Sequence, residues 1–558
     1  MARSIPLPSL HSLRHQYGPT VRQNKLRCLA HLESRPFRSP AALGRYHDDL
    51  LFLAAFPDDS EVREAAENSL TRWQARMRPT ALRNRFMDSG MAETTTRGVL
   101  SATMVRLLTL HYPGSIDLDS GALGSGDVLA PLLTRTLLRA EEDGFDSPGL
   151  TTRAWIRRAM AGQSGGILAW LLAQRPSGDP LAREWDTVFD EAEPSMAWSL
   201  PPAASATRLR LSFAPTAFRS GLRATPPSRS LSRPLREITL LDPPLAEEAI
   251  HVARVALASR GREVNAITEA NPGEVYLADL GEGVSLLVIG AMPHARMTLE
   301  ANYGHLLLAN GIPIGYGGVT PLGYQANTGV NIFPAFRRSE AGAIFGAALR
   351  AFATLFGVRR FVVNPYQFGR GNPEALASGA YWFYHRLGFE ATDPALRLLA
   401  TREHDRQKQE PGYRTDRTTL RRLAQGDLTL ALPGSGRHRV VDERCLARWS
   451  LAAAGVIGEK AAGRSRAVAL RRVVAETMTR VGLSRGTRWS RWERRGVGDL
   501  APVCALLPLE RWTPEELLSL GRMIRAKGSV QERNFVLAAQ AVPRLWRDLE
   551  RLAAQLPG

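Results

Sequence analysis

The sequence predicts an α+β protein, in which a central domain with a mixed sheet and helices on both faces lies between mainly α-helical N- and C-terminal domains. Three observations support this. Apolar residues recur at helical spacing through residues 40–200 and again through 396–558, whereas residues 237–395 alternate between short apolar strands and helices. Residues 201–236 are rich in Pro, Ser and Arg, which predicts a linker. Hydrophobic residues make up 44% of 558 positions, enough for several buried cores.

The N-terminal part divides at Ser39. Residues 1–39 contain Pro, Ser and Arg without a sustained period and without the apolar core of a secretory signal, which predicts a disordered basic tail. From Ser39 to Pro57 apolar residues recur at helical spacing, and Asp58 and Asp59 can cap the helix that follows. Similar patterns continue to residue 200, so an all-helical domain is expected there.

The chain carries a net charge of +18, from 72 basic and 54 acidic residues. Only four of the basic residues are Lys, and the other 68 are Arg. A GC-rich coding sequence explains this bias more simply than selection for phosphate binding, because Lys and Arg both bind phosphate. The charge therefore predicts only weak, salt-sensitive binding of nucleic acid or another polyanion.

Cysteine usage and hydropathy place limits on the compartment. Cys28, Cys445 and Cys504 are isolated and form no CxxC pair, so the sequence predicts neither a disulfide framework nor a metal site. No stretch of 18 apolar residues occurs, so no membrane span is expected. Together these features predict a cytoplasmic protein.

One basic stretch in the C-terminal domain needs a separate interpretation. Arg464–Arg495 contains ten Arg and only two acids, with Trp489 and Trp492 between them. Basic residues interleaved with aromatics can bind nucleic acid through phosphate contacts and stacking. A solvated surface in an Arg-rich protein is the simpler alternative.

The central domain begins with a strand and a helix. A short apolar strand is expected at Ile238–Leu241, followed by a helix that Pro243 and Pro244 open and Gly261 closes. Further strands are expected at Glu274–Leu280 and Ser285–Gly290.

A hairpin and a strand–helix unit follow. Asn310-Gly311 predicts a two-residue turn between strands at Tyr303–Ala309 and Pro313–Gly318. The remaining elements are expected in this order: a strand at Asn327–Phe333, a helix at Ala341–Gly357, a strand at Arg359–Val363, and a helix through Glu374–Leu387 that Gly388 caps.

Two motifs in this order resemble those of the GNAT superfamily of acyl-CoA N-acyltransferases. The segment NIFPAFRRSEAGAIFGAALRAF is similar to the family's strand, phosphate loop and helix, with matches at Pro334, Arg337 and Gly342. The segment NPEALASGAYWFYHRLGF is similar to its closing signature, with matches at Asn372, Ala375, Tyr384, Gly388 and Phe389. The resemblance covers the central domain only and implies a GNAT-like fold there.

The resemblance also implies a coenzyme site. Acetyl-CoA or another acyl-CoA would be the co-substrate, with an amine as acceptor and no metal. Its pyrophosphate would lie on the N–H groups that open the central helix, where the helix dipole favours anions. The coenzyme contacts implied are Phe333, Arg337, Arg338, Ser339, Ala341, Gly342, Ala343 and Asn372.

The catalytic assignments follow from the same resemblance. The strands on either side of the central helix splay apart in GNAT folds, and the thioester lies in that gap. Tyr384 matches the residue that protonates the departing thiolate, and the backbone near Gly329–Asn331 would polarise the carbonyl. Asn331 is the second catalytic candidate.

Three departures from the family pattern leave alternatives open. Glu340 stands where the family has the first loop glycine, and an insertion (SGAYWF) before Tyr384 is expected to lengthen its helix. The strand NTGVNIF lacks the Glu that many relatives use as a base, and the candidate substitutes are His294, Glu300, His305 and Asn331.

Three functions are therefore expected as rivals. The first is an acyl-CoA-dependent N-acyltransferase. The second, motivated by Glu340, is a degenerate or repurposed GNAT fold that acts as a binding or scaffold module. The third is a nucleic-acid-associated protein that uses Arg464–Arg495.

Overall fold

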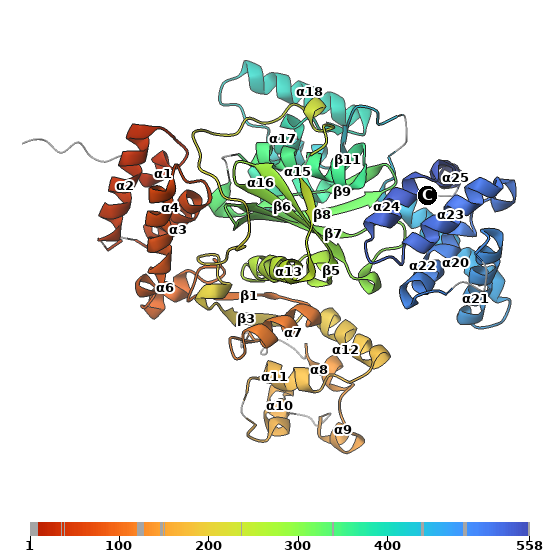
Figure 1. Cartoon of the computed structure of the whole chain (residues 1–558). Helices are drawn as coiled ribbons and strands as arrows, with labels where there is room; N and C mark the ends of the chain where they lie inside the picture. The colour runs from red at the N-terminus through yellow and green to blue at the C-terminus, as the bar shows by residue number, and fades with distance from the viewer. Residues whose placement is uncertain are drawn as a thin grey trace, which may run out of the picture.

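A central mixed sheet lies between two layers of helices, with helical lobes around it (Figure 1). The computed structural model describes residues 9–34, 36, 37, 39–119, 128–145, 149, 151–163, 165–235, 237–337, 340–436, 440–483 and 488–555. Within these ranges, no helix has the length and apolar character needed to cross a membrane. The expected mixed sheet flanked by helices is confirmed.

The central sheet has ten strands among the described residues, in the order β12-β13-β11-β9-β8-β7-β6-β5-β4, with β10 beside β8. Every pairing is antiparallel except that of β9 with β11. The strands are β4 (Ile238–Leu240), β5 (Ala270–Gly281), β6 (Val284–Ala291), β7 (Tyr303–Ala309), β8 (Ile312–Leu322), β9 (Gln325–Thr328), β10 (Asn331–Ile332), β11 (Arg360–Val363), β12 (Glu390–Ala391) and β13 (Leu428–Ala431).

Both faces of the sheet are buried. Along β6, Leu286 and Val288 face one core and Leu287 and Ile289 face another, as expected for a strand whose side chains alternate between two covered faces. One face is covered by α13 (Pro243–Ala258) and α14 (Asn265–Thr268), and the other by α15 (Ala341–Phe356), α16 (Pro373–Ser378), α17 (Ala380–Arg386) and α18 (Pro394–Gln409) (Figure 1).

The strongest local signals of the sequence hold. Asn310 and Gly311 have φ of 47° and 78°, and Ala309 pairs with Ile312, so the Asn-Gly hairpin is confirmed. The central helix α15 is confirmed, and it ends at Gly357 in the left-handed conformation.

The helix expected through Glu374–Leu387 is instead two helices. Gly379, with φ of 67°, ends α16 and begins α17. The insertion therefore does not lengthen the helix that carries Tyr384, because a left-handed glycine, the second residue of the inserted sequence, breaks the helix.

The expectation of a disordered tail is wrong for residues 9–34. They form α1 (Leu10–Leu13) and α2 (Pro19–Glu33), which pack on α3 (Pro40–Ala55) and α4 (Ser60–Thr71). Leu10, Leu13 and Leu29 are buried, and so is Lys25, which is 2.7 Å from Asp58. Two short helices complete this lobe, α5 (Trp73–Arg76) and α6 (Thr80–Arg85).

Residues 95–200 are not entirely helical as expected. They include a three-stranded antiparallel sheet in the order β1-β3-β2, whose outer strands β1 and β2 pair with β3, about 100 and about 80 residues later in the chain. No local turn signal announces such strands, so the helical periods around them dominated the prediction. The elements are β1 (Thr95–Val99), α7 (Ala102–His111), β2 (Ile116–Leu118), α8 (Ala130–Leu133), α9 (Arg139–Phe145), α10 (Thr152–Met160), α11 (Ile167–Ala173), α12 (Asp179–Ala192) and β3 (Ser195–Ser199).

The segment expected to be a linker, residues 201–236, is packed against the central domain over the part the structure describes. Leu209, Leu211 and Leu231 are buried, and the N–H of Leu211 donates to the Gly311 carbonyl at 2.9 Å. Between residues 201 and 235, all of which the structure describes, the segment contains two short 3₁₀ turns, Pro202–Ala204 and Ser228–Ser230. We call residues 212–235 the strap.

The C-terminal region has its own core but is not a separate unit from residue 396 onward. β13 lies between β11 and β12, so the expected boundary at 395 cuts through the sheet. The remaining helices are α19 (Arg417–Leu423), α20 (Glu443–Ala461), α21 (Arg466–Arg480), α22 (Arg491–Cys504), α23 (Pro514–Ala526), α24 (Arg533–Gln540) and α25 (Pro543–Gln555).

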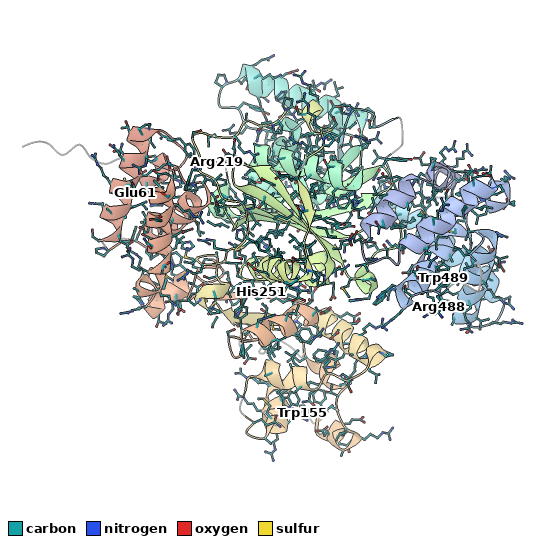
Figure 2. All side chains as sticks on the ribbon, in the orientation of Figure 1. Glu61, Trp155, Arg219, His251, Arg488 and Trp489 are labelled. Atoms are coloured by element: carbon teal, nitrogen blue, oxygen red, sulfur yellow. The ribbon has the colours of Figure 1, made fainter. Side chains whose placement is uncertain are left out.

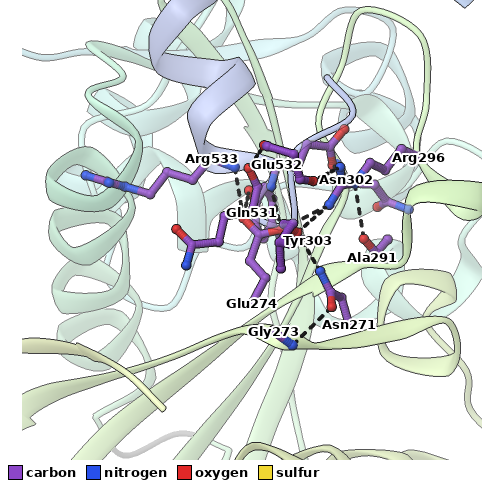
Figure 3. A network of polar contacts seen from close by, with 12 residues as sticks. Asn271, Gly273, Glu274, Ala291, Arg296, Asn302, Tyr303, Gln531, Glu532 and Arg533 are labelled. Carbon is purple, nitrogen blue, oxygen red and sulfur yellow. Dashed lines mark hydrogen bonds and ion pairs between the residues drawn. The ribbon is translucent and has the colours of Figure 1, made fainter. Parts of the chain in front are cut away.

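A buried polar network joins this region to the sheet (Figure 3). Glu274 of β5 is fully buried and accepts hydrogen bonds from the N–H groups of Glu532 and Arg533, at 2.7 and 2.8 Å. The Tyr303 hydroxyl donates to the same carboxylate at 2.7 Å, and the Arg296 guanidinium lies 3.7 Å away. Glu274 therefore caps α24 from another domain.

Candidate functional site

The pairing between β9 and β11 stops at Asn327, and we call the place where the two strands part the gap. Asn327 of β9 pairs in parallel with Val362 of β11. Beyond Thr328 the chain continues as β10, which pairs with β8 and with no other described strand. The ladder is interrupted at Gly329 and Val330, so these two residues lie where the strand diverges from β11.

The side chain of Tyr384 meets this interruption. Its hydroxyl lies near the Val330 N–H, and the rings of Phe345, Phe368 and Phe389 surround it at centroid distances of 6.0, 6.3 and 5.8 Å. Burial raises the pKa of Tyr384 well above its ordinary value, so the phenol is protonated. The structure thus brings a proton donor to the backbone N–H that faces the gap.

Gln367 is a residue at the gap that sequence reasoning missed. It lies in the 3₁₀ turn Pro365–Phe368 that follows β11. A Cβ at Gly329 would be only 2.5 Å from Cδ and Oε1 of Gln367, so the amide rests on the glycine backbone. No motif indicated this contact, since the two residues are distant in the chain and only the bare backbone of Gly329 allows it.

Among the candidate bases, Glu300 lies at the splayed strand. Burial raises the pKa of its carboxyl group, and the nearby Asn327 side chain lowers it. Ala326 belongs to the core on the α15 side, so Asn327 faces the opposite side of the sheet. Glu300 and Tyr384 therefore approach the strand from different faces.

The two histidine candidates lie elsewhere. His305 is fully buried, neither ring nitrogen has a partner, and burial lowers its pKa to about 3, which makes it a neutral core residue. His294 pairs with Glu269 at 3.0 Å and lies near Trp492 of the C-terminal region.

The N-terminus of α15 carries N–H groups that have no acceptor among the described residues. Glu340 is its N-cap residue, but the carboxylate does not cap the helix. No described residue accepts a hydrogen bond from the N–H groups of Ala341, Gly342 or Ala343. Unpaired N–H groups and the helix dipole together favour an anion at this end.

The Glu340 carboxylate is turned toward the strap. It is 5% exposed, lies 2.9 Å from a guanidinium nitrogen of Arg219, and accepts from the Arg223 N–H. Arg219 also pairs with Glu282 and lies between the N-terminal helices and the sheet (Figure 2). Glu340 therefore pairs with an arginine of the strap, Arg219. It does not need Arg337 or Arg338 of the adjacent loop as a partner.

The strap then follows α15. A Cβ at Gly342 would be 3.5 Å from Thr225 Oγ1, an ordinary contact. A Cβ at Gly346, one turn further, would be 2.9 Å from Pro226 Cγ, a distance that real side chains do not tolerate without movement. The strap therefore packs against the side of α15 where Gly342 and Gly346 have no side chains.

The other coenzyme candidates have structural partners. Phe333 is buried beneath Arg260, whose guanidinium carbon is 3.8 Å from the ring centroid. Arg337 is exposed and pairs with Glu374 at 2.8 Å. Asn372 caps α16 by accepting from the Ala375 N–H at 3.0 Å, the turn-residue role, and Asn331 is exposed on β10. Arg338 and Ser339 lie outside the described residues.

The basic stretch of the C-terminal region does not present its aromatics as an open platform. Trp489 lies under Arg525, with the guanidinium carbon 5.5 Å from its ring, and Trp492 lies near His294. Arg495 donates to the His294 carbonyl at 3.0 Å. Both rings are half-buried, on the side of the molecule labelled by Arg488 and Trp489 in Figure 2.

Comparison with protein-family models, with curated proteins and with solved structures finds no match to this chain. In the part of the chain that the structure describes, no three His, Cys, Asp or Glu side chains are grouped so that they could hold a metal ion.

Proposed function

We propose that the central domain is a GNAT-type acyltransferase that moves an acyl group from coenzyme A to an amine. The observation that carries this proposal is the contact between the Tyr384 hydroxyl and the Val330 N–H at the gap between β10 and β11. In the family that the sequence motifs resemble, the thioester lies in such a gap.

The residues of this chain would divide the chemistry as follows. The Val330 N–H, which lies near the Tyr384 hydroxyl, donates to the thioester oxygen as negative charge develops on it. The acceptor amine forms a bond to the acyl carbon, the carbon–sulfur bond breaks, and Tyr384 donates its proton to the leaving thiolate. Glu300, on the other face, takes the proton that the amine loses.

The free end of α15 fits the phosphates of the co-substrate. The N–H groups of Ala341, Gly342 and Ala343 supply donors, and Glu340 is held away from them by Arg219. A carboxylate aimed at a pyrophosphate would repel it by several kcal/mol when unscreened, on the order of 4 kcal/mol at 4 Å. The pairing with Arg219 removes that obstacle.

A second candidate function is a repurposed fold that does not use coenzyme A. It is favoured by the strap, because Thr225 and Pro226 lie against α15 beside the free N–H groups. In this alternative the strap is a permanent part of the core and the domain serves as a scaffold for the surrounding helical lobes.

Calorimetric titration of the full chain with acetyl-CoA and longer acyl-CoAs tests the proposal. We expect binding in the micromolar to millimolar range, and release of free thiol when a panel of amines is added. Absence of binding at millimolar ligand, both in the wild type and in variants that free α15, would favour the scaffold.

A pair of tyrosines separates catalysis from packing. Tyr384→Phe should lower the rate of acyl transfer by about 100-fold while leaving coenzyme affinity unchanged, because it removes the proton donor. Tyr381→Phe is the matched control, since the Tyr381 hydroxyl is buried without a partner. Equal activity of the two variants would remove Tyr384 from the mechanism.

A further inference from the structure

The strap is fixed on both sides of a short central piece. On one side, the Arg223 N–H donates to Glu340 and its guanidinium donates to the Leu280 carbonyl. On the other side, Leu231 is 1% exposed, and the Leu235 N–H donates to Thr354 Oγ1 of α15 at 3.0 Å.

The piece between these anchors, residues 224–230, is held weakly. None of its side chains is buried. Thr225 lies at Gly342 and Pro226 at Gly346 of α15, and Ser228 lies 3.4 Å from where a Cβ of Gly388 would be. Because little apolar surface is buried here, separating this piece from the helix exposes little to water.

The anchors, by contrast, are costly to break. Arg219 and Glu340 have side chains only 2% and 3% exposed, and removing either member of a buried pair leaves an uncompensated charge. Motion would therefore be confined to the piece between Arg223 and Leu231, with the ion pair intact.

We propose that residues 224–230 are a displaceable cover over the coenzyme side of α15, and that acyl-CoA lifts this cover from Gly342 and Gly346 while Arg219 continues to hold Glu340. This inference rests on the proposed function. Because the closed form competes with the ligand, the apparent affinity for acyl-CoA is reduced by the fraction of molecules that are open.

Distance measurements between spin labels on the full chain test the movement directly. The three native cysteines are buried, so labels go to introduced ones. In the variant Ser228→Cys/Leu398→Cys, saturating acetyl-CoA should shift the distance between the cover and α18 by several ångströms. In the control Leu222→Cys/Leu398→Cys the distance should stay the same, because Leu222 precedes the Arg223 anchor and is 55% exposed.

A glycine substitution tests the competition. Gly346→Ala places a methyl group 2.9 Å from Pro226 Cγ and should push the cover open, tightening acetyl-CoA binding by about tenfold. Gly455→Ala in α20 is the control, since nothing lies within 4 Å of that position and affinity should not change.

The outcomes separate the cover from the function. Suppose that acetyl-CoA binds, that the label distances do not change, and that Gly346→Ala does not raise the affinity. This result overturns the displaceable cover and leaves the acyltransferase proposal standing. No binding of acetyl-CoA to the wild type or to Gly346→Ala overturns the proposed function itself. Binding only by Gly346→Ala supports the cover in its strongest form.

Discussion

Two helices of this protein, α15 and α24, begin beside a buried glutamate, and the two glutamates behave differently. At α24, Glu274 accepts from the N–H groups of Glu532 and Arg533 and completes the helix end. At α15, Glu340 turns away to Arg219, and the first N–H groups of the helix keep no described acceptor.

A buried carboxylate near a helix N-terminus can therefore have either of two effects on the N–H groups of that helix. A carboxylate that accepts from helix N–H groups satisfies them and stabilises the dipole, so it makes a permanent joint. A carboxylate that is neutralised sideways leaves the donors and the dipole available for another anion. By this criterion α24 makes a structural contact, whereas the first turn of α15 fits the proposed acyl-CoA site.

Loss of the carboxylate at α24 should produce the largest effect. Glu274→Ala leaves two N–H groups, the Tyr303 hydroxyl and Arg296 without their shared partner, and should lower the free energy of unfolding by about 3–5 kcal/mol. The first transition in urea unfolding measures this. Glu248→Ala, at an exposed acid that accepts from Ser212, should cost less than about 1 kcal/mol. Similar losses of unfolding free energy in both variants would contradict a structural role for the contact between Glu274 and α24.

The ion pair at α15 should show a smaller but clear coupling. A double-mutant cycle with Arg219→Met and Glu340→Gln should give a coupling energy of about 1–3 kcal/mol, because both side chains are buried. The same cycle on Arg337 and Glu374, which are 49% and 61% exposed, should give less than about 1 kcal/mol. Equal couplings would mean that the strap anchor is no firmer than a surface pair.

The pH dependence of stability should report Glu274. Burial raises its pKa to about 7, against the lowering by the N–H groups of Arg533 and Glu532 and the Tyr303 hydroxyl. A carboxyl group with a raised folded pKa favours the folded state while it is protonated, so its contribution is present below the unfolded pKa and is lost as pH rises toward 7. The loss is on the order of 3 kcal/mol. In Glu274→Ala the stability between pH 5 and 8 should be flatter; an unchanged profile would contradict the shift.

The elements that sequence reasoning predicted are those with local signals. Asn310-Gly311 defines its own turn, and α15 carries its apolar period within sixteen residues. β13 gave no such signal. It has only four residues, and it is a strand because it pairs with residues distant in the chain, such as Val363. The sequence predicted a tail for residues 9–34 because many of them are basic or polar, and few apolar residues mark the buried side of α2.

The site divides in the same way. Tyr384 could be proposed because a motif carries its position, and the Val330 backbone beside it lies within the expected range Gly329–Asn331. The partner of Glu340 was missed, since Arg219 is 121 residues earlier in a segment without any period. The strap shows no hydrophobic period, because it lies along the surface of α15 and forms no long helix or strand.

The smallest expected effect bears most directly on the comparison of the two helix ends. Inorganic pyrophosphate at about 10 mM should stabilise the wild type by about 1.4 kcal/mol if it binds α15 with a Kd of about 1 mM, and by less if it binds more weakly. Gly342→Asp, at the second position of α15, suits the helix dipole but repels the anion, so the stabilisation should disappear.

The matched change at the other helix is Asn534→Asp, the second position of α24. Because Glu274 already fills that end, this variant should respond to pyrophosphate as the wild type does. If pyrophosphate stabilises Gly342→Asp as much as the wild type, the anion binds elsewhere on this chain of net charge +18, and the free N–H groups of α15 are not a phosphate site. If both Asp variants lose the response, the helix ends do not differ, and the distinction between joint and ligand site fails.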